Sequence, residues 1–71
     1  MIALSFPAEL YSERAIADAA QAFGDVAVCV VEPAADHFVV HVTATTELDE
    51  QLLADELGNY VLGRTIERRG R

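Results

Sequence analysis

The spacing of apolar residues changes along this chain, and the order of those changes restricts the fold more than any other feature. Ile2, Leu4 and Phe6 alternate with small residues, which is typical of a strand with one buried face. Residues 12–23 then place apolar side chains at helical spacing, and Ser12 is a suitable N-cap. The chain is therefore expected to begin with a strand and a helix.

Two β-branched segments follow, at residues 26–31 and 37–45, and a short turn joins them into a hairpin. Thr46, with Asp49 three residues later, resembles the capping box of a final helix. The order β-α-β-β-α predicts an α+β fold with a three-stranded mixed sheet and two helices on one face. This is a ferredoxin-like unit without its last strand. We expect residues 37–45 at the centre of the sheet, and the valine-rich strand largely covered on both faces.

Length and charge narrow the possible roles. A chain of 71 residues has room for one small domain, which we expect to end in an Arg-rich tail from about residue 67. Residues 1–63 carry eleven acids and only Arg14, whereas residues 64–71 carry four arginines and Glu67. An acidic body repels phosphate backbones, so nucleic acid is an unlikely partner. The sequence also lacks a long apolar run and has a single cysteine, which indicates a cytoplasmic protein with no membrane association.

The last helix carries more apolar residues than one buried face needs. Two alternatives follow. The helix breaks near Gly58, so that each half turns its own face to the core, or one stripe contacts a partner. One stripe consists of Leu53, Leu57, Tyr60 and Val61, and the opposite stripe consists of Leu48, Leu52, Leu62 and Ile66.

No residue pattern predicts a catalytic, cofactor or metal site. His37 and His41 share one face of a strand, but at about 3.3 Å per residue they are roughly 13 Å apart, too far to bind one metal ion. Cys29 lies among valines, where a small buried residue is the simplest interpretation. The acids of residues 47–56 do not have the spacing of an EF-hand loop and are expected to form a solvated helix face. We therefore expect a protein that is not an enzyme.

Two segments of the chain resemble a known family. The first runs from Phe6-Pro7-Ala8-Glu9-Leu10 through to Phe23, and the second is Leu52-Leu53-Ala54-Asp55-Glu56-Leu57-Gly58-Asn59-Tyr60-Val61-Leu62. Both are similar to HxsD, a small protein of the His-Xaa-Ser systems that are encoded beside radical SAM enzymes. Leu57, Tyr60 and Leu62 match the family's C-terminal signature. Gly58 and Asn59 replace its Asn-Asp pair, and Gly63-Arg64 replaces its Arg-Glu pair.

The resemblance implies an accessory or adaptor protein in the maturation of a ribosomally made peptide. Such a protein would bind a radical SAM enzyme, its precursor peptide, or both, and the family has no established catalytic residues to transfer. The alternative is a self-associating regulatory or structural module, such as a homodimer. In either case the expected contacts are a sheet edge and the extra stripe of the last helix. The candidate partner-binding residues are Ile2, Leu4, Phe6, Leu48, Leu52, Tyr60, Leu62 and Ile66.

Overall fold

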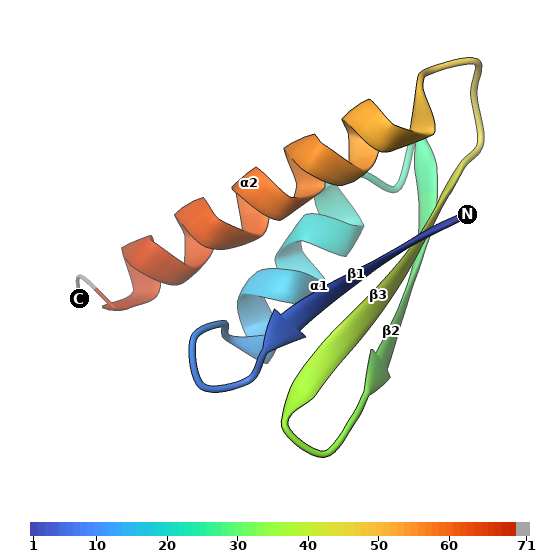
Figure 1. The fold of residues 1–71 in the computed structure, drawn as a ribbon. Helices are drawn as coiled ribbons and strands as arrows, with labels where there is room; N and C mark the ends of the chain where they lie inside the picture. Colours follow the sequence, from blue (N-terminus) through green and yellow to red (C-terminus); the bar gives the residue numbers. More distant parts are fainter. Residues whose placement is uncertain (70–71) are drawn as a thin grey trace.

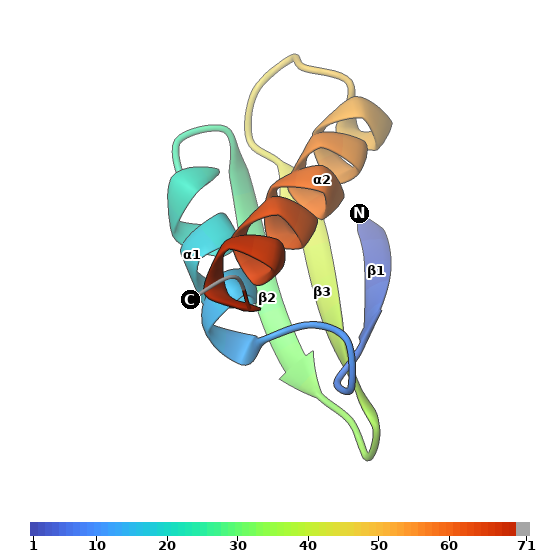
Figure 2. The same cartoon turned by 90° about the vertical axis from the view of Figure 1, so that its left-hand side faces the viewer.

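The computed structural model describes residues 1–69 and confirms an α+β fold with the order β-α-β-β-α (Figure 1). Both helices lie on the same face of a single sheet (Figure 2). The elements are β1 (Ile2–Pro7), α1 (Glu13–Ala22), β2 (Ala27–Pro33), β3 (His37–Ala44) and α2 (Glu50–Arg69).

The sheet has the strand order β1-β3-β2, with the hairpin strand β3 at the centre as expected. Both ladders are antiparallel, so the prediction of a mixed sheet is wrong. The crossover does make β1 and β2 run in the same direction, but β3 turns back tightly and inserts between them. One row across the sheet joins Leu4, Val40 and Val31, and the next core-facing row joins Ile2, Val42 and Cys29.

The first helix is built from small residues, which lets it lie close to the sheet. The hydroxyl of Ser12 accepts a hydrogen bond from the Ala15 amide at 3.1 Å, which confirms Ser12 as the N-cap. Ala15, Ile16 and Ala19 are completely or almost completely buried. An alanine-rich face has no long side chains to hold the backbones apart, so Ile16 reaches the centre of the core.

The second helix begins later than the sequence predicted. Thr46 only accepts a hydrogen bond from the Leu48 amide, at 3.3 Å, and does not cap the helix. Asp49 does so instead, since its carboxylate accepts from the amides of Gln51 at 2.8 Å and Leu52 at 3.2 Å. A carboxylate at this position also interacts favourably with the positive end of the helix dipole.

The same helix continues through Gly58 without a break, so the first of the two alternatives for its apolar stripes is wrong. A glycine inside a helix costs about 0.5–1 kcal/mol relative to alanine. Leu53, Leu57 and Val61 are all buried on the straight helix. Burying each such side chain contributes about 1.5–3 kcal/mol, which outweighs the cost of the glycine.

The Arg-rich end of the chain begins within the last helix. Helix α2 extends to Arg69, so the predicted Arg-rich tail from about residue 67 overlaps its last turn. Residues 70 and 71 lie outside the described part of the chain. Within that part, no helix combines the length and the hydropathy that a membrane span requires.

The core occupies the layer between the sheet and the helices. Its central members are Val40 and Val42 of β3, which are fully buried, with Leu57 and Val61 of α2 packed above the sheet. The chain therefore buries one face of its sheet and one face of each helix. The buried residues of the core are Phe6, Ala15, Ile16, Ala19, Ala27, Val40, Val42, Leu53, Leu57 and Val61.

The two glycines of α2 allow a test of this packing. A Cβ added at Gly58 or Gly63 would meet no other atom within 4 Å outside its own helix turn. We expect Gly58→Ala to raise the free energy of unfolding by about 0.5–1 kcal/mol, because alanine has the higher helix propensity. Urea denaturation at low protein concentration measures this change. Leu57→Ala is the control and should lower stability by about 2–5 kcal/mol. A destabilising Gly58→Ala would contradict the straight, open helix.

Candidate functional site

The predicted partner-binding residues of β1 face the core and not the solvent. Phe6 is buried and packs edge-on against Tyr11, with ring centroids 5.1 Å apart. Ile2 and Leu4 are half-buried on the same side of the strand. Their side chains therefore pack beneath the helices, and the part of β1 that remains for a partner is its backbone edge.

That edge is incompletely covered. Leu4 is level with Val40 and Ile2 is level with Val42 across the β1–β3 ladder. The two central valines are fully buried, whereas their neighbours on β1 are only half-buried. In the described residues no strand pairs with the outer side of β1, so its remaining backbone donors and acceptors and part of two apolar side chains stay accessible.

The extra stripe of the last helix lies on its outer side. Leu52, Leu62 and Ile66 are 60%, 44% and 61% exposed. Leu48 is also exposed but lies before the helix begins. Figure 1 shows no other element over the outer side of α2. The structure therefore brings three of the predicted residues together on one surface and places Leu48 at its N-terminal end.

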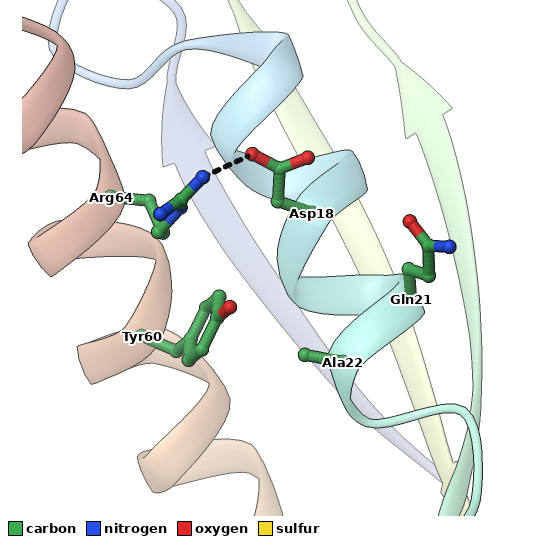
Figure 3. A pocket seen from close by; sticks show the side chains of 5 residues that line it. All are labelled: Asp18, Gln21, Ala22, Tyr60 and Arg64. Carbon is green, nitrogen blue, oxygen red and sulfur yellow. Dashed lines mark hydrogen bonds and ion pairs between the residues drawn. The ribbon is translucent and has the colours of Figure 1, made fainter.

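Tyr60 belongs to a different surface. Its ring packs edge-on against Phe23 at a centroid distance of 5.9 Å, which directs it toward α1 and away from the outer stripe. It lines a shallow hollow of about 280 Å³ between the two helices (Figure 3). The other lining residues are Asp18, Gln21, Ala22 and Arg64.

The charges in this hollow are balanced internally. Arg64 donates to Asp18 at 3.2 Å and to Glu67 at 2.9 Å. The hydrogen bond to Asp18, followed by the charge of Glu67, raises the pKa of the Arg64 guanidinium above its ordinary value. A guanidinium that already faces two carboxylates attracts an anionic ligand weakly, so the hollow is better understood as the joint between the helices.

The sequence analysis missed an apolar surface on the sheet. Val28 and Val30 were expected to be covered on both sides, but they are 53% and 55% exposed. The prediction failed because an uninterrupted apolar run is typical of a strand covered on both faces, whereas both helices here lie on the other face. The useful signal was the predicted placement of both helices on one face, because that arrangement leaves the other face of the sheet without a covering helix.

The two histidines of the sheet each lie near one carboxylate and do not form a reactive cluster. His37 Nδ1 lies 2.7 Å from Asp36, and His41 Nε2 lies 3.9 Å from Glu32. The hydrogen bond from His37 lowers the pKa of Asp36. Burial raises the pKa of the Cys29 thiol, which disfavours the thiolate that nucleophilic chemistry needs. Among the residues described, no three histidine, cysteine or acidic side chains are grouped to hold a metal ion.

We expect the protein to have no metal requirement. His37 and His41 lie near different carboxylates and not near each other's, and among the described residues the thiol of Cys29 is not grouped with other ligands. Elemental analysis of untagged protein after dialysis against a chelator should show less than one ion per chain. One retained ion per chain, lost on His41→Ala, would contradict this expectation.

Glu50 links three elements at one end of the molecule. Its carboxylate lies 2.6 Å from the amino group of Met1 and accepts a hydrogen bond from the Ala44 amide at 2.9 Å. It therefore ties the first turn of α2 to β1 and to the end of β3. The Met1 amino group, followed by the Ala44 amide, lowers the pKa of Glu50 below its ordinary value.

The contacts of the Glu50 carboxylate predict that the free energy of unfolding depends on pH. Because the folded-state pKa of Glu50 is lowered, its contribution to stability is complete above the ordinary glutamate range and is lost as the pH falls through the folded value. The Glu50→Gln variant should therefore be less stable than the natural chain at pH 7, and the difference should disappear in acid. Paired urea denaturation curves at several pH values measure it. A difference that stays constant down to pH 3 would show that the ion pair contributes nothing.

Comparisons with known proteins give no assignment. No protein-family model matches the chain, and neither the curated proteins nor the solved structures contain a match. The candidate surfaces therefore have to be interpreted from their own geometry.

Proposed function

We propose that this protein is a non-catalytic accessory or adaptor protein in the maturation of a ribosomally made peptide, where it binds a radical SAM enzyme, its precursor peptide, or both. The family resemblance of residues 6–23 and 52–62 supports this role. The observation that carries the proposal is the open edge of β1 beside a fully buried central strand. A cytoplasmic location is part of the same proposal.

Binding by strand addition suits this edge. An extended peptide beside β1 would receive main-chain hydrogen bonds, and its alternate side chains would supply selectivity. On the helix side, apolar side chains of the peptide would cover the exposed parts of Ile2 and Leu4. On the open side they would meet Ala3 and Ser5, which are small and exposed and leave room for larger side chains. The edge therefore favours a peptide with apolar residues at every second position.

The acidic body adds a second preference. Residues 1–63 carry a net charge of −10, so a peptide or enzyme surface with basic residues is attracted more strongly than an acidic one. The Met1 amino group is already paired with Glu50, which leaves few free cations near the start of β1. The proposed partner is therefore a basic, apolar segment that binds in an extended conformation.

The proposal predicts that complex formation protects the amides of residues 2–6. Hydrogen exchange should be measured on the chain alone and with a co-expressed radical SAM enzyme and precursor peptide from the same genome neighbourhood. Exchange at these amides should slow markedly, because new backbone hydrogen bonds form there. Equal exchange rates in both samples would exclude strand addition at β1.

Substitutions at Leu4 provide a matched pair for the same binding experiment. Leu4→Pro removes a backbone donor and bends the edge, so it should abolish binding, whereas Leu4→Val should preserve it. Circular dichroism must show that Leu4→Pro remains folded. Val30→Pro on β2 is the control for the opposite edge. If only Val30→Pro abolishes binding, the binding site lies at the edge of β2 and not at the edge of β1. If the chain neither binds the enzyme or peptide nor changes the yield of modified peptide, the proposed function is wrong.

A further inference from the structure

The side of the sheet opposite the helices, which we call the open face, is more apolar than an ordinary solvated face (Figure 2). An antiparallel sheet with one solvated face usually carries apolar residues on the core side and polar residues on the other. Val40 and Val42 face the core, so the alternate positions of β2 and β3 point outward. Three of them hold valines, of which Val28 and Val30 are exposed and Val39 is half-buried. Apolar residues gathered on an open face indicate a contact that covers it.

The open face is not level, because its side chains become longer from β1 to β2. The ladders place Ala3, His41 and Val30 in one row across the three strands. The next row consists of Ser5, Val39 and Glu32. In each row the residue of β1 is shorter than the residue of β2. The open face is therefore low over β1 and high over β2.

The charge distribution favours a second copy of this chain as the partner. All twelve acids of the chain lie within the described residues, and Glu32 is the only one of them in a strand. The others lie in the helices and connections, so a second copy that approached the helices would bring acid against acid. Two copies that meet through their open faces keep both helix layers outside a pair of sheets about 10 Å apart. Charges separated by more than the Debye length of about 8 Å are largely screened. Two copies therefore repel each other least at the open face.

We propose that the open face binds a second copy of this chain, with the two sheets packed face to face around a two-fold axis that runs along β3. This axis places β2 of each copy over β1 of the other. Val30 then lies over Ala3 of the second copy, so the high side of each face fills the low side of the other. Two sheets pack in this way with their strands about 30° apart, and a two-fold contact closes at two copies.

The position of His41 agrees with this axis. Its Nε2 atom lies 3.9 Å from Glu32, so the ring leans toward β2. Because β2 lies on opposite sides of the axis in the two copies, the two rings lean away from each other. An axis across the strands would instead place β2 over β2 and β1 over β1. Long side chains would then meet long ones and leave gaps between the small ones, which close packing disfavours.

The size of the open face indicates how strong the contact is. Three strands with their side chains cover about 14 by 20 Å, from a strand spacing of about 4.8 Å and a rise of about 3.3 Å per residue. Such a face buries less than the standard interface of about 800 Å² per partner, so we expect a dimer that forms at high protein concentration. The contact uses the face of the sheet and not the backbone edge of β1. It therefore does not depend on the proposed peptide binding.

Sedimentation velocity on the untagged chain over a range of concentrations tests the dimer. We expect a monomer–dimer equilibrium that Val30→Asp weakens by about thirtyfold or more, because a charge enters the contact. Leu52→Asp is the matched control: it makes the same kind of change at an equally exposed residue on α2, and it should leave the dissociation constant nearly unchanged. A monomer at all concentrations up to about 1 mM, or a dimer that survives Val30→Asp, would overturn the proposal. A dimer that only Leu52→Asp disrupts would also overturn it, because the contact would then lie on the helices.

An exchange of side-chain sizes tests the two-fold arrangement without adding a charge. Ala3→Leu adds an apolar side chain at an exposed position, which would strengthen any unspecific apolar association. In the proposed packing Val30 of the second copy already fills that space, so Ala3→Leu should weaken the dimer by about tenfold or more. The double variant Ala3→Leu with Val30→Ala exchanges the high and low sides and should restore association. A dimer that Ala3→Leu strengthens or leaves unchanged, or a double variant as weak as the single one, would contradict the arrangement.

Discussion

The structure depends on the burial of a single face of a three-stranded sheet. Val40 and Val42 at the centre of that face are fully buried, and both helices are needed to cover them and their neighbours. The alanine-rich face of α1 lets it pack close to the sheet, which leaves room for α2 beside it (Figure 2). In the described residues no further element covers the opposite face of the sheet. Apolar residues outside the one core layer therefore remain at the surface.

This constraint leaves three accessible surfaces of different character. The outer side of α2 carries long, flexible side chains, of which Leu52 and Ile66 are about 60% exposed. The open face of the sheet carries the shorter side chains of Val28 and Val30 beside His41. The edge of β1 offers mainly backbone. Helices pack through interlocking side chains and strands through main-chain hydrogen bonds, so the three surfaces suit different contacts.

The sequence predicted the order of the elements, the Ser12 cap and the central position of β3, because these follow from local periodicity and from connection rules. It did not predict which face of Val26–Val31 would be open, since an unbroken run of valines carries no information about direction. The expected break at Gly58 failed for an energetic reason: continuous burial from Leu53 to Val61 stabilises the helix by more than the glycine costs. The exposed stripe could be predicted from sequence, but its occupant could not, because no residue spacing identifies a partner.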